Sequence, residues 1–191
     1  MLLITGVGRS GTLYTTHVLR AAGYDVGHEH HLGAHGMVSW EWAIEADFYP
    51  NWHVCNQPEF DVILHQVRHP LKTIASCTKA VNKEAWRYIY ANTPIDPESP
   101  LLQRCAEYWY HWTLYAEKRA SWTYQVEMLD KLIGEFCERL GIPEISEKVL
   151  KSVPKNTHKG AKTEKLTWKD LEYSTPYYLQ IREMAEGYGY T

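Results

Sequence analysis

The residues of this sequence that could do chemistry begin with a glycine-rich turn. Gly6, Gly8 and Gly11 interrupt a segment that starts with the apolar residues 2–4 and ends at Thr12. Glycines allow a tight turn and a close approach of the backbone to an anion, and the free N–H groups at the start of a following helix bind negative charge. The spacing therefore predicts a site for a phosphate or a similar anion.

This turn differs from the loop of nucleoside triphosphatases, which reads G-x-x-x-x-G-K-[ST]. Here Thr12 directly follows Gly11, and Arg9 inside the turn is its one cation. The expected anion site is kept, but the lysine that reaches the β- and γ-phosphates of a triphosphate is missing.

A second candidate anion group follows the apolar, β-branched run Val62–Val67. Arg68 ends this run, and Pro70 suits the first turn of a helix that would carry Ser76 about two turns further on. A guanidinium offers a fork of donors that matches a phosphate. We expect the Arg68 guanidinium and the Ser76 hydroxyl to lie within reach of one anion.

Histidines gather in a short polar stretch, namely His28, His30, His31 and His35. Zinc is one interpretation, because His31 and His35 would lie on one face of a helix. Gly33 and Gly36 disfavour a helix there, so we expect no metal site.

The elements that must position these groups alternate between strand and helix. Strands are predicted at 2–5, 25–28, 62–67 and 122–126, and helices at 12–22, 39–48, 70–82, 83–90, 101–119 and 129–140. Such alternation indicates an α/β fold, a three-layer sandwich with a central parallel sheet. Strand 62–67 is expected at its centre, and the stretches 92–100 and 151–169 are expected to be loops. Ligands bind at the carboxyl ends of such strands.

Length and composition limit the class of protein. The chain has 191 residues, which fits one domain over 1–191, and a net charge of −3, which does not favour nucleic acid as a partner. Four cysteines without a C-x-x-C pair suit free thiols in a reducing compartment. We expect a cytoplasmic protein without a membrane partner, because no signal peptide or membrane-spanning run is evident.

Taken together, the two anion motifs resemble those of sulfotransferases. The segment Gly8–Thr12 is similar to their 5′-phosphosulfate loop, in which a basic residue precedes Ser-Gly-Thr. Arg68, with Ser76 eight positions later, is similar to their 3′-phosphate motif. Weaker likenesses follow in the family's order at 124–143 and 158–160, whereas the middle of the chain matches no motif of the family.

The resemblance implies a P-loop NTPase-like sulfotransferase fold and a metal-free site for the donor 3′-phosphoadenosine 5′-phosphosulfate. The residues that would hold the 5′-phosphosulfate are Gly8, Arg9, Ser10, Gly11, Thr12 and Leu13. Arg68 and Ser76 would hold the 3′-phosphate, and Lys159 with Gly160 would form a lid. Arg9 would also stabilise the transferred group.

The acceptor needs a general base, which contributes about 10²–10⁴-fold. Several branches of the family use a glutamate just after a glycine at this place, which implies Glu29. The cytosolic branch uses a histidine shortly before the central strand, and His53 occupies a similar place. His28, His30 and His31 are further candidates. The acceptor itself is expected to be a small molecule or a carbohydrate.

Two other functions remain open. A small-molecule kinase could use the same fold, but it needs Mg²⁺ held by an acid at a strand end, and strand 62–67 ends without one. A nucleotide-binding domain without turnover would keep the glycine turn and lose the chemistry.

Overall fold

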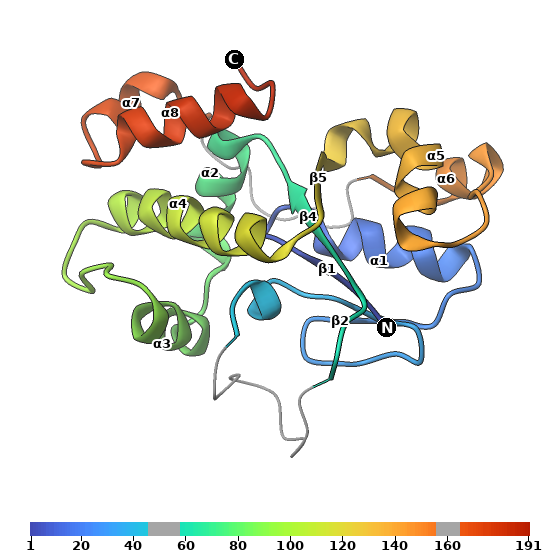
Figure 1. Ribbon diagram of the computed structural model, residues 1–191. Coiled ribbons are helices and arrows are strands. Elements are labelled where there is room, and N and C mark those ends of the chain that lie inside the picture. The colour runs from blue at the N-terminus through green and yellow to red at the C-terminus, as the bar shows by residue number, and fades with distance from the viewer. Residues whose placement is uncertain (46–57, 156–164) are drawn as a thin grey trace.

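A computed structural model of the chain describes residues 1–45, 58–155 and 165–191. Five strands form one sheet in the order β2-β3-β1-β4-β5, and every neighbouring pair is parallel (Figure 1). Their bounds are Leu2–Thr5 for β1, Val26–His28 for β2, Gly36–Val38 for β3, Val62–Val67 for β4 and Trp122–Gln125 for β5.

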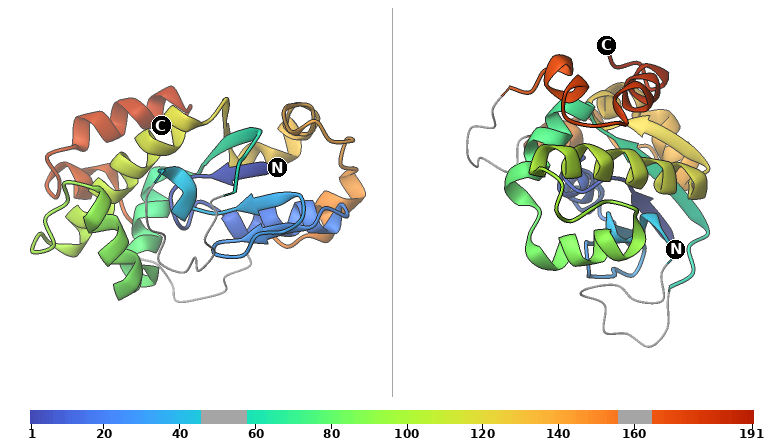
Figure 2. Two further views of the ribbon diagram at one scale, coloured as in Figure 1. Left: turned by 60° about the horizontal axis from the view of Figure 1, so that its bottom comes forward. Right: turned by 90° about the vertical axis from the view of Figure 1, so that its left-hand side faces the viewer.

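Both faces of the sheet are covered by helices (Figures 1 and 2). On one face lie α1 (Thr12–Ala21), α5 (Leu129–Leu140) and α6 (Glu147–Ser152), whose buried residues pack with Leu2 and Ile4 of β1. Because successive side chains of a strand point to opposite faces, Leu3 joins the core on the other side. The apolar run of β1 is thus buried on both faces, as a parallel sheet requires.

The other face carries more helices and most of the buried tryptophan. These helices are α2 (Pro70–Ala80), α3 (Lys83–Asn92), α4 (Leu101–Arg119), α7 (Trp168–Glu172) and α8 (Tyr178–Gly187). Trp109 and Trp112 of α4 are fully buried, and the Trp112 indole N–H donates to the Trp40 carbonyl at 2.7 Å. The predicted α/β fold, a three-layer sandwich around a parallel sheet, is confirmed.

The predicted helix at 39–48 is wrong where the structure describes it. The strand β3 precedes it, and only the short 3₁₀ turn η1 (Glu41–Ala43) follows before residue 46. A Cβ on Gly36 would lie 1.9 Å from the Leu2 carbonyl oxygen, so this glycine lets β3 pair closely with β1. A strand of three residues that begins at a glycine carries too little periodicity to be recognised.

Other differences concern the order of the sheet and the end of the chain. The middle strand is β1, and β4 lies between β1 and β5. The stretch 151–169, predicted as a loop, holds the end of α6 and the start of α7, while 156–164 lies outside the described residues. Helix α8 was not predicted, although Ile181, Met184 and Ala185 lie at helical spacing.

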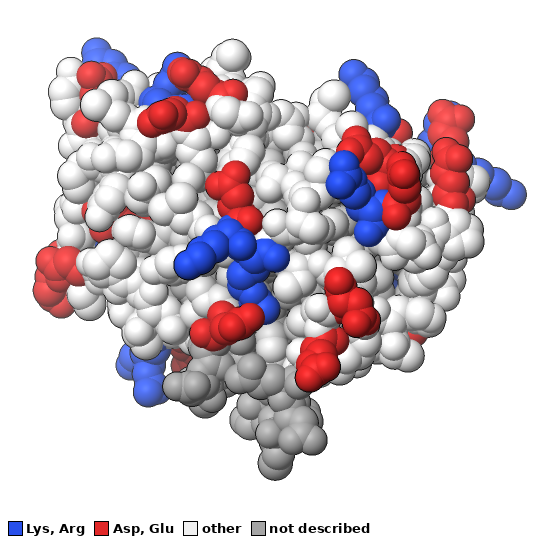
Figure 3. Space-filling model, in the orientation of Figure 1, with Lys and Arg blue, Asp and Glu red and all other residues white. Residues whose placement is uncertain are grey.

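Charges on the surface are mixed. On the face shown in Figure 3, basic and acidic side chains lie interspersed, and Arg119 pairs with Glu45 at 3.5 Å. Within the described part of the chain, no helix is long and apolar enough to cross a membrane. Cys77, Cys105 and Cys137 are free and buried, and Cys55 lies outside the described residues.

Candidate active site

The glycine turn joins the end of β1 to the start of α1, at the carboxyl edge of the sheet. A Cβ on Gly6 would lie 2.2 Å from the Gln66 carbonyl oxygen, so glycine is needed where the turn passes β4. Gly11 has φ 99° and Arg9 has φ 74°. A positive φ raises the conformational free energy of a residue that has a side chain, and contacts with neighbouring residues must offset this cost.

Gln66 of β4 fixes the turn from beneath. Its amide Nε2 donates to the Ser10 carbonyl at 2.9 Å, and its Oε1 accepts from the hydroxyls of Tyr124, at 2.8 Å, and Thr15. The side chain is fully buried, so these bonds leave few polar atoms unpaired. Sequence reasoning missed this residue, although a lone amide inside an apolar strand is a usable signal.

Tyr108 of α4 holds the middle of the turn. The Gly8 N–H donates to the Tyr108 hydroxyl oxygen at 3.0 Å, and the Cys77 thiol contacts the Gly8 carbonyl at 3.6 Å. Burial keeps the pKa of Tyr108 well above its ordinary value, so the phenol stays neutral. This contact spans one hundred positions and was not foreseen from the sequence.

The start of α1 presents unused donors. Among the described residues no acceptor is found for the backbone N–H groups of Gly11, Thr12 and Leu13, and α1 has no side-chain N-cap bond. Unpaired N–H groups at a helix start favour an anion. Leu13 is half-buried and contributes its backbone here, whereas the Ser10 side chain is buried toward Gln66.

The cationic residues of the site converge on the turn. The Arg9 Nε donates to the Ser76 Oγ at 3.1 Å, and the Arg68 Nη1 donates to the Arg9 carbonyl at 3.1 Å. Arg68 follows β4 directly, and Ser76 lies in α2, as the spacing suggests. Arg9 therefore contacts the Arg68 guanidinium through its carbonyl and the Ser76 hydroxyl through its side chain.

The turn between β4 and α2 is completed by distant residues. One carboxylate oxygen of Glu127 accepts the His69 N–H at 3.0 Å, and the other accepts the Tyr190 hydroxyl at 2.8 Å. The rings of His69 and Tyr190 also contact each other, with centroids 5.2 Å apart. The turn that carries Arg68 is thus held by contacts among three segments that are far apart in the sequence, at residues 69, 127 and 190.

Glu29 lies on the other side of the turn, just after β2. Its backbone N–H donates to the Val38 carbonyl at 3.0 Å, and its φ is 56°. The Thr12 hydroxyl donates to Glu29 Oε1 at 3.3 Å, and the His28 Nε2 lies 3.2 Å from the same oxygen. Glu29 and Arg9 are the non-glycine residues with positive φ in the described chain, and both belong to this site.

The protonation of Glu29 is strongly shifted. Burial, followed by the nearby Glu41 carboxylate, raises its pKa to about 8, while the Thr12 hydrogen bond and Arg9 act in the opposite direction. Its Oε2 is buried, with no hydrogen-bond partner among the described residues. Once it is ionised, this carboxyl group is a candidate to accept a proton from a bound group.

Glu41 changes one conclusion from the sequence. It follows β3, which neighbours β1, and it is buried in η1. No acid was predicted at the end of strand 62–67, and β4 has none, but β3, which Glu41 follows, was not predicted. A buried carboxylate does follow a strand beside the glycine turn.

His31 and His35 do not lie on one face of a helix, as the zinc interpretation of these histidines requires. Residues 31 and 35 flank a tight turn in which Gly33 bridges Gly36, and the His35 Nδ1 accepts the Asp25 N–H at 3.0 Å. Within the ranges that the structure describes, no group of three or more His, Cys, Asp or Glu is placed to hold a metal ion. The predicted His53, Lys159 and Gly160 lie outside the described residues.

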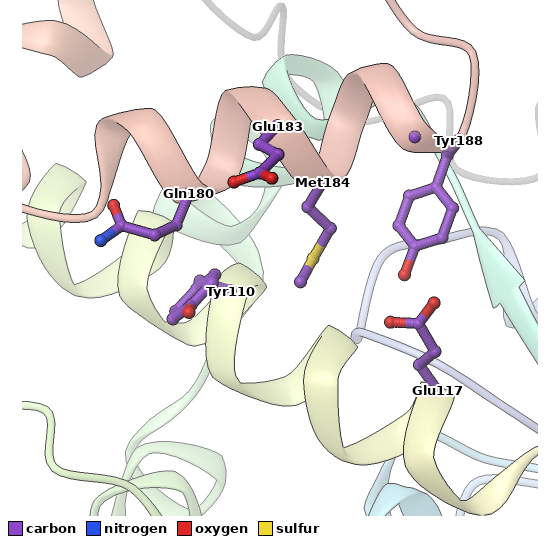
Figure 4. A pocket seen from close by; sticks show the side chains of 7 residues that line it. Tyr110, Glu117, Gln180, Glu183, Met184 and Tyr188 are labelled. Carbon is purple, nitrogen blue, oxygen red and sulfur yellow. The ribbon is translucent and has the colours of Figure 1, made fainter.

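Two hollows in the surface lie away from this site. One, of about 320 Å³, lies between α4 and α8, where the Tyr188 phenol points toward Glu117 (Figure 4). The other, of about 360 Å³, is lined by residues of α6 with Asp130 and Lys155. No described residue of the glycine turn lines either hollow.

Comparisons with known proteins add one structural likeness. No family model and no curated protein matches the sequence. Among solved structures, the chain is similar to the mouse sulfotransferase SULT7A1 complexed with PAP, at a TM-score of 0.45 and 11% sequence identity. The match covers 96% of this chain and 81% of that chain. A likeness at this level does not indicate a function, so the geometry of the site is the evidence for one.

Proposed function

We propose that this protein is a sulfotransferase that moves a sulfuryl group from 3′-phosphoadenosine 5′-phosphosulfate to an acceptor hydroxyl or amine. One observation carries the proposal. Arg68 and Ser76 both contact Arg9 beside the unused N–H groups of α1, and Glu29 reaches the same helix start through Thr12. Anion-binding groups and a proton acceptor therefore share one edge of the sheet.

The donor carries two separate anionic groups, and the site offers two adjacent sets of anion-binding groups. The N–H groups of Gly11, Thr12 and Leu13, together with Arg9, suit the 5′-phosphosulfate. Arg68 and Ser76 suit the 3′-phosphate, because a guanidinium binds phosphate with paired donors. A loop without a lysine agrees with a donor that has no γ-phosphate.

The chemistry assigned to the chain is the movement of one proton and the stabilisation of charge. As the acceptor oxygen or nitrogen bonds to sulfur, its proton passes to Glu29. The bond between sulfur and the bridging oxygen breaks, and its electron pair leaves with the phosphate of the nucleotide. The N–H groups of α1 and the Arg9 guanidinium stabilise the charge that develops there.

The acceptor is proposed to be a small molecule or a carbohydrate. A protonatable carboxyl group at the end of β2 suits a neutral hydroxyl, which donates a hydrogen bond to it. Two neighbouring acids, Glu29 and Glu41, would repel an acceptor that carries an anionic group close to its reacting atom.

A magnesium-dependent small-molecule kinase is the second candidate, and Glu41 favours it. A buried acid after a strand beside the glycine turn resembles the carboxylate that holds Mg²⁺ in such enzymes. The missing loop lysine argues against this function.

Calorimetric titration tests the two functions against each other. The probes are 3′-phosphoadenosine 5′-phosphate and Mg-ATP, used on the wild type, Arg68→Ala and the control Arg87→Ala, which removes an exposed arginine. We expect the 3′-phosphorylated nucleotide to bind more tightly, and Arg68→Ala to weaken it about 10–100-fold. Preference for Mg-ATP, or equal affinity in Arg68→Ala, would reject the sulfotransferase.

Transfer itself is measured with radiolabelled donor and a panel of phenols, alcohols and sugars. Binding of the nucleotide without label on any acceptor, and without slow hydrolysis of the donor, would favour a nucleotide-binding domain that lacks turnover.

A further inference from the structure

We propose that His28 and Glu29 act as one proton-accepting unit, in which His28 takes up the proton that Glu29 receives. His28 is a positioning residue in this unit, because it acts through Glu29. Its role in transfer rests on the proposed function, but the sharing of a proton between the two side chains does not.

Three polar atoms lie within hydrogen-bond distance of one another. The His28 Nε2 is 3.2 Å from Glu29 Oε1 and 3.2 Å from the Thr12 Oγ1, and Oγ1 is 3.3 Å from Oε1. Two hydrogen bonds join these atoms, one from the Thr12 hydroxyl to Oε1 and one between the His28 Nε2 and the Thr12 Oγ1, while Nε2 and Oε1 form an ion-pair contact. The Thr12 hydroxyl, which can donate one hydrogen and accept another, therefore links the two side chains.

Two arrangements of the hydrogens are chemically reasonable. When Glu29 is ionised, the His28 Nε2 donates to Thr12 Oγ1 and the Thr12 hydroxyl donates to Oε1. When Glu29 is protonated, its O–H donates to Oγ1 and the Thr12 hydroxyl donates to the Nε2 lone pair. The two states differ by the movement of one hydrogen along each of these two bonds, which carries one proton from one side chain to the other, so the pair titrates as a unit rather than as two independent groups.

The surroundings of Glu29 make this transfer useful. A carboxyl group with a pKa of about 8 holds its proton at neutral pH and is then no base. Glu41 from η1 disfavours charge on Glu29, whereas Arg9 from the turn favours it, and the buried Tyr108 of α4 stays neutral. Transfer of the proton to His28 restores an anionic carboxylate, whose Oε2 has no hydrogen-bond partner among the described residues.

Nuclear magnetic resonance of the ligand-free protein tests the shared proton without any sulfuryl transfer. The His28 ring is followed by ¹H–¹⁵N spectra from pH 5 to 9 in the wild type and in Glu29→Gln, with the exposed neighbour His30 as internal control. We expect His28 to titrate in two steps in the wild type and in a single step in Glu29→Gln. A single step in the wild type would overturn the proposal.

The rate of transfer tests the role in catalysis. His28→Gln keeps a donor for the Thr12 Oγ1 but takes up no proton. We expect kcat to fall about 10-fold or more at neutral pH, and the ascending limb of the pH profile to move upward by about one unit. The control His17→Gln, in α1, keeps the wild-type profile. A uniform fall in kcat at every pH would overturn the role, because a merely structural side chain has that effect.

The two failures can be told apart. Absence of transfer in the wild type counts against the proposed function, while the two-step titration still decides on the shared proton. Transfer in the wild type with a single-step titration counts against the unit alone. Melting curves of His28→Gln and Glu29→Gln confirm that the variants are folded.

Discussion

The two sides of the candidate site are built on different principles. The donor side is cationic, and its geometry is set by neutral buried groups: Gln66 beneath the turn and Tyr108 above it. The proposed acceptor side is formed by Glu29 and His28, which lie 3.2 Å apart, and burial and the nearby Glu41 raise the pKa of Glu29. Thr12 joins the two sides, because its N–H belongs to one and its hydroxyl to the other.

Because of this difference, the two sides of the site are sensitive to different changes. Guanidinium groups stay charged at any working pH, so the donor side depends on shape and on the contacts that hold it. The acceptor side keeps its shape through the strand ends, but its chemistry depends on which group carries a proton. Changes to the two sides should therefore have separable effects.

The largest effect is expected from Glu29→Gln. The amide keeps the size of the side chain and removes the proton acceptor, so we expect transfer to fall about 10²–10⁴-fold. Affinity for 3′-phosphoadenosine 5′-phosphate should change less than about twofold, because the donor side is intact. Single-turnover kinetics and calorimetry measure the two quantities.

The matched control for Glu29→Gln is Glu59→Gln, which neutralises an exposed carboxylate. Equal losses of transfer in both variants would show that general charge, rather than Glu29, supports the reaction.

A smaller effect is expected from Gln66→Leu, which breaks the donor side. The change removes the partners of the Ser10 carbonyl and of two hydroxyls, and unpaired buried groups cost about 1–3 kcal/mol each. Thr15 and Tyr124 lie 3.4 Å apart and can bond each other, which limits the loss in unfolding free energy to about 2–4 kcal/mol.

Urea denaturation measures this loss, and Gln180→Leu is the control, because Gln180 is an exposed glutamine of α8. Stabilities of the two variants that agree within about 0.5 kcal/mol would contradict the role of Gln66.

The smallest effect is a pH dependence of stability that belongs to the acceptor side. The pKa of Glu29 is raised from 4.5 to about 8 on folding, so the unfolded chain ionises first and the folded state loses stability as pH rises between these values. The loss is at most a few kcal/mol and is reduced by solvent, since 22% of the side chain stays exposed.

Glu29→Gln removes this dependence. We therefore expect its melting temperature to approach or exceed that of the wild type at pH 8 and to show no such gain at pH 5. Ser76→Ala, on the donor side, should keep a constant difference from the wild type at both pH values. An unchanged difference for Glu29→Gln would contradict the raised pKa.

Local patterns in the sequence predicted the parts of the fold that depend on short-range order. The strands β1 and β4 and the helix α4 are long or strongly apolar, and they lie where the pattern predicts. The spacing of Arg68 and Ser76 placed them at one edge of the sheet, and both contact Arg9 in the structure. The roles of these residues in binding stay predictions.

Contacts between distant segments could not be read from the sequence. The short strand β3 is stabilised by its pairing with β1, and this pairing brings Glu41 close to Glu29. Likewise, nothing near Gly8 in the sequence indicates Tyr108, which approaches from a helix one hundred positions away. A contact between two segments that are far apart in the sequence leaves no periodic pattern of residues in either segment.

The turn that carries Arg68 also bears on how the protein is made. Glu127 joins His69 to Tyr190 across separations of 58 and 63 positions, so the turn is finished by segments that leave the ribosome long after Arg68 does. The Arg68 guanidinium gains its final support only when these later segments fold back. A chain that has been synthesised only as far as residue 126 therefore lacks the carboxylate that fixes this turn.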